Sequence, residues 1–374
     1  MVKIVIFCLL ISGAVQARVL RVGPTRTLTT PSAAAQVARD GDIVEIDAGR
    51  YKGDVARWRA NRLILRGVGG PAVLDAGGRS LGGKALWVIR GDDTLVENIV
   101  FSGVRVADQN GAGIRLEGDG LTLRHCVFHD NQMGFLVGAR PNSDVTIEHS
   151  EFFNNSVIIP GARHIGHNIY IGRIRSFTLR FSYVHDAHVG HNVKSRAART
   201  LIAYNRIVDG PSGEASYVVD LPNGGEALLI GNVLQQGPRS QNFMLVSFGE
   251  EGRLHSRNKL TMVNNTLVSD RRGAIFVRNT TDQAAWLINN LVVGTGLLSW
   301  GPAQQMGNLH PFWPRFVDWR TLDFHLRAGA PAIDAGVALA DPRLTPSHEA
   351  DGAPRRIIGV IDAGAYEAGP VPPN

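Results

Sequence analysis

A short run of apolar residues around one small polar residue recurs seven times along the chain. Its copies start 23 to 33 residues apart, which is too short and irregular for paired-helix repeats and suits one turn of a parallel β-helix with variable loops. Parallel crossovers strongly favour the right hand. We therefore predict an all-β fold, a single-stranded right-handed parallel β-helix. The segments are LRHCVFHD from Leu123, IEHSEFFN from Ile147, LRFSYVHD from Leu179, IAYNRIVD from Ile202, LIGNVLQQ from Leu229, MVNNTLVS from Met262 and LINNLVVG from Leu287.

Aligning these segments places their polar residues in one column, which we expect to face inward as a hydrogen-bonded ladder between coils. The earlier segment LVENIVFS adds Asn98 in the same register. An apolar column two positions later indicates the core, and the mixed residues between the columns indicate the outward face of a strand. The polar column is Asn98, Cys126, Ser150, Ser182, Asn205, Asn232, Asn265 and Asn290, and the apolar column is Val100, Phe128, Phe152, Val184, Ile207, Leu234, Leu267 and Val292.

A second strand in each coil is predicted from the segments GIRLE, GFLVG, NIYIG, NVKSR and YVVDL. Its alternate positions should face outward, and because neighbouring strands lie about 4.8 Å apart, side chains from two or three coils can contact one sugar unit. We expect Asn168 and Asn192 in one outward column and Arg196 in another. Two further columns lie between these two outward columns. The inward one consists of Ile114, Phe135, Ile169 and Val193, and the outward one of Arg115, Leu136, Tyr170 and Lys194.

The ends of the chain differ from the repeats. Residues 1–17 have a lysine, a short apolar run and small residues at Val15 and Ala17, as in a secretory signal peptide cleaved after Ala17. The run is too short to cross a bilayer, and no other stretch is apolar enough to be a membrane span. We expect a periplasmic or secreted protein with a β-helix domain over 18–367. This domain includes an amino-terminal cap over 18–60 and a closing segment over 307–367, and a disordered tail follows over 368–374.

Composition narrows the class of partner. The 374 residues carry a formal net charge of +6 and a pI near 9.6, which favours an anionic partner. Export and the lack of a nucleic-acid motif argue against nucleic acid, so an acidic polysaccharide is the expected partner. Cys8 leaves with the signal peptide and Cys126 remains alone, so no intramolecular disulfide can form. We expect a monomer.

Both ends of the predicted domain resemble known proteins. Thr30 and Pro31 begin a predicted helix, followed by the dipeptide Gly41-Asp42 and a strand ending in Gly49-Arg50-Tyr51. These features resemble the amino-terminal cap of secreted polysaccharide lyases and related β-helix proteins, and imply a helix across the first coil. The segments DFHLRAGAPAIDAG and GVIDAGAYE resemble the closing segments of bacterial secreted β-helix proteins. Their carboxylates, Asp334, Asp362 and Glu367, are expected to fix turns and cover the last coil.

Histidines gather where the repeats are interrupted, between Arg163 and Asp220. Five of the 12 histidines lie there, and histidine concentrates at sites that exchange protons near neutral pH. His185 next to Asp186 repeats His129 next to Asp130, which favours a turn for that pair. Zinc ligation has no supporting motif, so we favour acid–base chemistry. The five are His164, His167, His185, His188 and His191.

The stretch NVKSRAARTLIAYNRI resembles the lysine-bearing strand and turn of chondroitinase B and its alginate-lyase relatives. The resemblance implies that Lys194 is the base that removes the C5 proton of a uronic acid. The arginine of that family in the next coil is missing, because YVVDLPNGG places Asp220 there. The calcium-binding acidic pattern of the family is also not matched by Glu214, Asp220 and Glu226, so no cofactor is assigned and calcium stays open.

The sequence thus predicts a polysaccharide lyase that cleaves an acidic glycan by β-elimination. A uronate C5-epimerase shares the proton abstraction, a glycoside hydrolase would need two spaced carboxylates, and a non-catalytic glycan-binding protein would share the fold. These alternatives stay open. The candidate catalytic residues are Lys194, His191, Tyr170 and His167, and the candidate substrate-binding residues are Asn168, Asn192, Arg196, Asp220 and His188.

Overall fold

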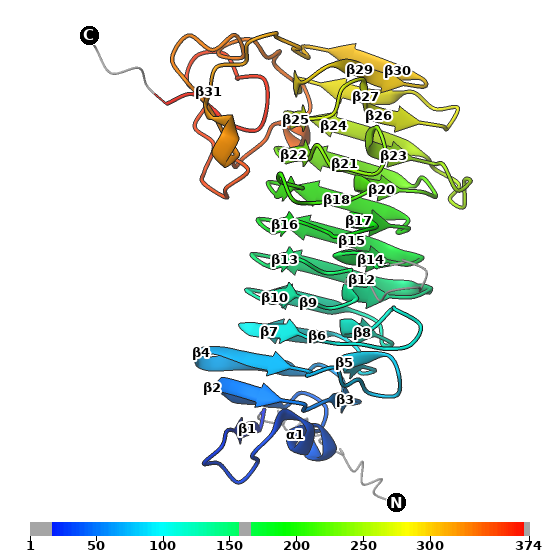
Figure 1. Ribbon diagram of the computed structural model, residues 1–374, viewed down its shortest axis with the longest axis vertical. Coiled ribbons are helices and arrows are strands. Elements are labelled where there is room, and N and C mark those ends of the chain that lie inside the picture. The colour runs from blue at the N-terminus through cyan, green and yellow to red at the C-terminus, as the bar shows by residue number, and fades with distance from the viewer. Residues whose placement is uncertain (1–16, 157–165, 370–374) are drawn as a thin grey trace, which may run out of the picture.

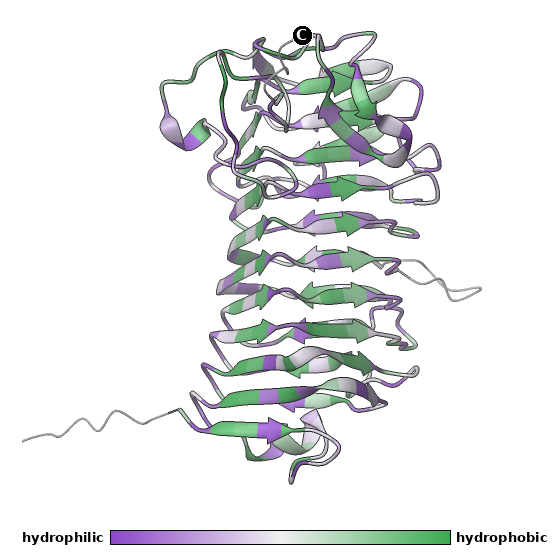
Figure 2. Ribbon diagram, turned by 90° about the vertical axis from the view of Figure 1, so that its left-hand side faces the viewer, coloured by the Kyte–Doolittle hydropathy of each residue, from purple (hydrophilic) through white to green (hydrophobic). Residues whose placement is uncertain are grey.

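The computed structural model describes residues 17–156 and 166–369, which form one elongated stack of coils (Figure 1). A typical coil has three short strands, and each strand pairs in parallel with its equivalent in the next coil. Apolar residues dominate the stacked strands and fill a continuous core along the stack (Figure 2). The predicted parallel β-helix is therefore confirmed.

Ten strands form one sheet, which carries the candidate residues Tyr170, Lys194 and Asp220. Twenty strands form a second sheet, which bends sharply within each coil. The ten are β3 (Ala56–Trp58), β5 (Ala85–Ile89), β8 (Ala112–Leu116), β11 (Met133–Val137), β14 (Ile169–Ile171), β17 (His191–Ser195), β20 (Tyr217–Leu221), β23 (Met244–Phe248), β26 (Ala274–Asn279) and β29 (Gly296–Trp300). The twenty are β1 (Val19–Val22), β2 (Ile43–Lys52), β4 (Ile64–Asp75), β6 (Thr94–Glu97), β7 (Ile99–Ser102), β9 (Leu121–Arg124), β10 (Val127–His129), β12 (Arg140–Glu148), β13 (Glu151–Phe153), β15 (Ile174–Arg180), β16 (Tyr183–His185), β18 (Arg199–Ala203), β19 (Arg206–Val208), β21 (Glu226–Ile230), β22 (Val233–Gln236), β24 (Lys259–Val263), β25 (Thr266–Ser269), β27 (Ala285–Ile288), β28 (Leu291–Val293) and β30 (Ala303–Met306).

The polar column forms a ladder of amide side chains buried along the stack. The backbone N–H and the Nδ2 of Asn205 donate to Oδ1 of Asn232 at 2.9 and 3.0 Å. Asn232 repeats this pattern on Asn265, and Asn265 on Asn290. All four side chains are fully buried, so the predicted ladder is confirmed. It also extends one coil further than expected, because Asn290 donates to Asn308 at 2.9 Å.

Asn98 is not part of this ladder, and its predicted register is wrong by one residue. Val96 pairs with Leu123, so Asn98 lies level with His125 at the bend, and both have a left-handed φ, 56° and 52°. Asparagine adopts this conformation readily, and its amide donates to two carbonyls of the preceding coil. Phe101, rather than Val100, therefore continues the apolar column.

A second internal ladder joins the other corner of the coils, and it corrects the expectation for Asn168 and Asn192. Nδ2 of Asn131 donates to Asn155, that of Asn155 to Asn168, and that of Asn168 to Oδ1 of Asn192, at 3.1, 2.9 and 2.8 Å. Both Asn168 and Asn192 are fully buried. They hold the coils together from inside and do not present a surface to substrate.

Asp209 lies buried beside this second ladder. Its two carboxylate oxygens both accept from the backbone N–H of Ala215, each at 3.2 Å. Burial raises the pKa of the Asp209 carboxyl to about 7, although the Ala215 hydrogen bond opposes the shift. The folded chain therefore binds the proton of this carboxyl much more tightly than an exposed aspartate would.

The amino-terminal cap agrees with the expectation. Helix α1 (Pro31–Val37) begins at Thr30, whose hydroxyl accepts from the Ala33 N–H, and it lies at the first coils (Figure 1). The predicted signal peptide, 1–17, lies almost wholly outside the described residues, and the predicted tail, 368–374, lies mostly outside them. No helix within 17–156 or 166–369 has the length and apolar character needed to span a membrane.

The closing segment packs on the flank of the stack and does not cover the last coil. It contains the antiparallel pair β31 (Phe316–Asp318) and β32 (Asp323–Leu326), and the 3-10 helices η1 (Trp319–Thr321) and η2 (Pro342–Leu344). Phe316, Phe324 and Tyr366 pack against outward apolar residues of β19, β22, β25 and β28. Leu297 and Trp300 on β29, the end strand of the ten-stranded sheet, remain exposed. Asp334, Asp362 and Glu367 bind backbone amides or Arg355, so their expected role in fixing turns is confirmed.

We predict that Asn232→Leu destabilises the protein strongly. The substitution leaves the Ile202 carbonyl and the backbone and side-chain N–H groups of Asn205 without their partner, whereas Oδ1 of Asn265 keeps the bond from the backbone N–H of position 232. Each buried group left unpaired costs about 1–3 kcal/mol. Chemical denaturation measures the free energy of unfolding. The matched control is Asn142→Leu at an exposed position of β12. Equal stability of the two variants would contradict the structural role of the ladder.

We predict that Asp209→Asn stabilises the protein at alkaline pH. A folded-state pKa raised to about 7 contributes stability that is complete below an unfolded pKa of about 3.9 and is lost as the pH rises through the folded value. The asparagine keeps an oxygen for Ala215 but cannot ionise. The difference in melting temperature, variant minus wild type, should be more positive at about pH 8 than at about pH 5. Scanning calorimetry at the two pH values measures this difference. A difference that is the same at both pH values would contradict the assigned ionisation.

Candidate functional site

The outward column of the ten-stranded sheet brings Tyr170, Lys194 and Asp220 together from successive coils. Tyr170 on β14 pairs with Lys194 on β17, and Lys194 pairs with Asp220 on β20. The predicted order Arg115, Leu136, Tyr170, Lys194 is confirmed by the strand pairing. The same column continues through Ser247, Arg278 and Trp300.

Lys194 lies at the centre of an ion-pair network. Its Nζ is 2.8 Å from Oδ2 of Asp220 and 2.8 Å from Oε1 of Glu251, a residue of the loop between β23 and β24. Nη2 of Arg196 binds the other oxygen of Glu251 at 2.6 Å, and its Nε donates to the Tyr170 hydroxyl at 3.2 Å. We call these residues the lysine cluster: Tyr170, Lys194, Arg196, Asp220 and Glu251.

Two stacked imidazoles border the lysine cluster. The rings of His167 and His191 lie 4.7 Å apart, and Nδ1 of His167 accepts from the backbone N–H of His191. Nδ1 of His191 accepts from the Tyr217 N–H at 3.3 Å, so its Nε2 carries the proton and faces Oδ2 of Asp220 at 3.4 Å. His191 is therefore arranged to orient Asp220 rather than to accept a proton.

Burial sets the protonation of this site. Burial, with the Lys194 charge second, lowers the pKa of His191 to about 3, and burial also lowers that of His167 well below its usual value. Burial raises the pKa of Asp220 despite the opposing charge of Lys194. For Glu251 burial acts in the same direction, but the hydrogen bonds from Lys194 and Arg196 outweigh it, so its pKa is lowered. The two histidines are uncharged at neutral pH, and Asp220 is the more basic carboxylate.

The structure brings most of the predicted site residues together, but with less exposure than we expected. The side chain of Lys194 is only 9% exposed and that of His191 12%, because Asp220 and the Glu251 loop cover them. His188 is exposed on the loop before β17, and outside the lysine cluster. His185 lies on the other sheet, bound to Asp186 and Glu151. His164 lies outside the described residues.

Sequence reasoning missed Glu251, Tyr217 and Asn223. Glu251 is 57 residues from Lys194, and the loop that carries it follows no repeat, so only its pair of adjacent acids, Glu250 and Glu251, could have drawn attention. Asn223 accepts from Arg196 through Oδ1 and donates to the Glu251 carbonyl. Tyr217 donates to Glu250. These contacts fix the loop against the sheet.

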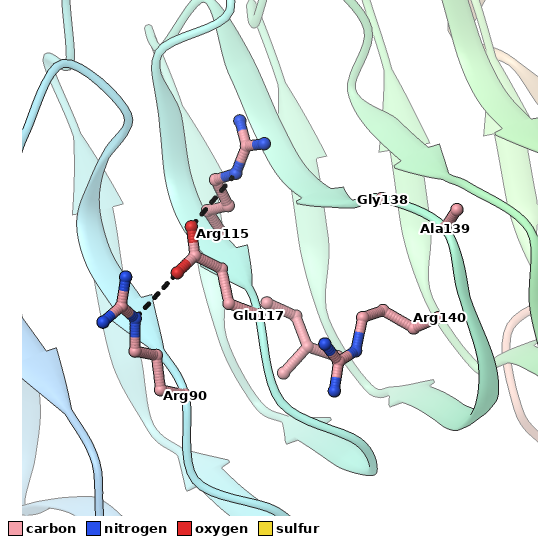
Figure 3. Close-up of a pocket in the computed structure, with 7 residues that line it drawn as sticks. Arg90, Arg115, Glu117, Gly138, Ala139 and Arg140 are labelled. Atoms are coloured by element: carbon pink, nitrogen blue, oxygen red, sulfur yellow. Dashed lines mark hydrogen bonds and ion pairs between the residues drawn. The ribbon is translucent and has the colours of Figure 1, made fainter.

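A hollow of about 430 Å³ opens on the same sheet, two coils before Tyr170. Figure 3 shows Glu117 between Arg90 and Arg115, with Arg140 on the opposite side. Glu117 is 2.8 Å from Nε of Arg90 and 3.8 Å from that of Arg115. Three arginines against one glutamate give this part of the lining a positive charge, and Arg115 belongs to the same outward column as Lys194.

The carboxylates considered for calcium do not converge. Glu214 pairs with Arg239, Glu226 with Arg257 and Asp220 with Lys194. Each is engaged by a cation of the chain, and calcium binds where several oxygen ligands surround one point. These three residues therefore do not fit a calcium site, and we derive no step through a metal at the lysine cluster.

Comparisons with known proteins agree with the architecture. Residues 77–234 match the model of the family described as right handed beta helix region. The crystal structure of pectate lyase Pel9A is similar over 96% of this chain and 98% of that one, with a TM-score of 0.69 and 13% identity. Alginate lyase from Paenibacillus sp. str. FPU-7 covers 74% of this chain and 94% of its own, with 15% identity and a TM-score of 0.43.

The A-module of the Azotobacter vinelandii mannuronan C-5 epimerase AlgE6 covers 75% of this chain and 93% of its own, with 13% identity and a TM-score of 0.39. No curated protein sequence matches the chain. At these identities the likeness concerns the fold. The strand pairing, the matched family model and the similarity to Pel9A identify the chain as a right-handed parallel β-helix protein.

Proposed function

We propose that the chain is a polysaccharide lyase that cleaves an acidic, uronate-containing glycan by β-elimination at the lysine cluster. The observation that carries this proposal is the single ammonium of Lys194 held between Asp220 and Glu251, with Arg196 beside it. The signal-like residues 1–17 and the positive net charge support action on an anionic polymer outside the cytoplasm.

The first requirement of the reaction is neutralisation of the substrate carboxylate, because the C5 proton is otherwise barely acidic. Arg196 is suited to this step, since a guanidinium binds a carboxylate through two parallel hydrogen bonds. At present Nη2 of Arg196 and Nζ of Lys194 bind the two oxygens of Glu251. Glu251 thus occupies the place that a uronate carboxylate would take, and its half-exposed side chain can move aside.

Lys194 and Asp220 supply the base. Their ion pair becomes a neutral pair when the proton on Nζ moves to Oδ2, over a separation of 2.8 Å, and the raised pKa of Asp220 favours that transfer. The free amine of Lys194 then takes the C5 proton. The electron pair of the broken C5–H bond forms the C4=C5 double bond, and the C4–O4 bond breaks.

Tyr170 is placed to protonate the departing O4. Its hydroxyl lies in the coil before Lys194 and accepts from Nε of Arg196 at 3.2 Å. The neighbouring guanidinium stabilises the phenolate that forms when the proton is given up. His191 and His167 hold Asp220 and the strand ends in place and carry no proton in this scheme.

The same arrangement weighs against a glycoside hydrolase. That reaction needs one carboxylic acid and one free carboxylate on either side of the glycosidic bond. Here Asp220 and Glu251 share one ammonium, so neither is free. We further propose that the polymer runs along the outward column towards Arg115, where the arginine-lined hollow receives another acidic sugar.

Incubation with pectate, alginate and other polyuronates tests the proposal. Elimination creates an unsaturated sugar and raises ultraviolet absorbance. A changed ratio of C5 epimers without that absorbance would instead identify an epimerase, and new reducing ends without it a hydrolase. Binding without any chemical change would identify a non-catalytic glycan-binding protein.

We predict that Lys194→Ala lowers the turnover number by about 10²–10⁴, the usual contribution of a positioned base, while the fold is retained. Lys194→Arg should be nearly as slow, since a guanidinium keeps the charge but cannot release its proton. The initial rate of absorbance increase measures the effect, with exposed Lys259→Ala as the control. Turnover at the wild-type rate by folded Lys194→Ala would place the base elsewhere.

We predict that Glu251→Gln binds the polymer more tightly, with a KM lowered several-fold and kcat little changed. Glutamine keeps the shape of the side chain but removes the carboxylate that competes for Lys194 and Arg196. The gain should shrink as salt is added, because salt screens the added positive charge. Glu226→Gln serves as the control. A large loss of kcat would show instead that Glu251 takes part in the chemistry.

A further inference from the structure

A second group of ligand-type side chains lies in the closing segment. His325 lies on β32, and Glu349 and Asp351 lie on the irregular segment that returns beside it. One ligand atom from each of the three lies within 4.8 Å of the others. Nε2 of His325 is 3.7 Å from Oδ2 of Asp351. The proposed function uses none of these residues.

Each of the three side chains is oriented by a second polar contact. Oδ1 of Asp323 is 2.6 Å from Nδ1 of His325, so Nδ1 carries the proton and the lone pair of Nε2 faces Asp351. The Glu367 N–H donates to Oε1 of Glu349 at 3.1 Å, and the Ala353 N–H to Oδ1 of Asp351 at 2.9 Å. Metal-binding histidines and carboxylates are held by outer partners of this kind.

The surroundings close one side of the group and leave the other accessible. The ring of Tyr366 packs 3.9 Å from that of His325, and Tyr366 and Phe324 are buried in the cluster that fixes the segment to the stack. Asp351 is exposed. Among the described residues, Asp351 is within ion-pair distance of His325 only. A small cation can therefore reach a preformed set of one nitrogen and two carboxylate ligands.

We propose that His325, Glu349 and Asp351 bind a divalent transition metal of the zinc type, with water completing the coordination. An imidazole ligand suits zinc, whereas calcium and magnesium take oxygen ligands. The ion links β32 to the segment around residue 350, two parts of the closing segment that no strand pairing joins within the described residues. Its role is to hold this segment on the flank of the β-helix, independently of any activity at the lysine cluster.

Metal titration of the purified, tag-free chain tests this proposal. After treatment with a chelator, Zn²⁺ is titrated by calorimetry and Co²⁺ by visible absorption. We expect one ion per chain, the absorption of a low-coordinate Co²⁺ site, and a melting temperature that rises with Zn²⁺ because the ion binds the folded state. His325→Ala should abolish binding, and Asp323→Asn should weaken it by about 10–100-fold through the orientation of the imidazole.

Two further variants keep the result interpretable. Asp351→Asn changes an exposed residue, so the fold is retained and the affinity alone should fall. His310→Ala removes an exposed histidine elsewhere in the closing segment and should bind zinc as the wild type does. Absence of stoichiometric Zn²⁺ binding by the wild type, or unchanged affinity in both His325→Ala and Asp351→Asn, would overturn the proposal.

Discussion

The hydrogen bonds between amide side chains of successive coils fix the register between the coils, and therefore which residues of neighbouring coils lie beside one another. Each ladder asparagine donates from both its backbone N–H and its Nδ2 to the side-chain Oδ1 of its equivalent in the next coil. A shift of one residue would leave buried polar groups without partners, which is costly. Because the inward positions are fixed in this way, outward residues from different coils are brought into line. The alignment of Tyr170, Lys194 and Asp220 follows from it.

The repeats were predictable because a β-helix places the same type of residue at the same position of every coil. Asparagine, however, serves two positions, the ladder and the left-handed bend, and the sequence of LVENIVFS does not distinguish them for Asn98. Asn168 and Asn192 were expected on the surface for a different reason, because each precedes an inward residue of a strand, but their side chains turn inward and join the second ladder. Glu251 was beyond prediction because its loop has no equivalent in other coils, and only the folded stack brings it to Lys194.

The lysine cluster differs from an ordinary surface network in its degree of burial. Exposed ion pairs contribute little and are screened by salt, but Lys194 and Asp220 are nearly inaccessible, and a half-exposed Glu251 covers them. Burial raises the pKa of Asp220 and keeps His191 uncharged. In the proposed mechanism the proton therefore moves between Lys194 and Asp220. The positive charge of Arg196 and of the arginine-lined hollow extends along the same face. Under the proposed function, this positive strip is where an anionic polymer would bind.

The most direct test is a crystal structure of Lys194→Ala with a bound acidic oligosaccharide. We expect a uronate carboxylate on Arg196 in place of Glu251, the C5 hydrogen facing the space vacated by the lysine, and the glycosidic oxygen within hydrogen-bonding reach of Tyr170. An oligosaccharide bound on another face, or one whose carboxylate avoids Arg196 while Glu251 keeps its present contacts, would contradict it.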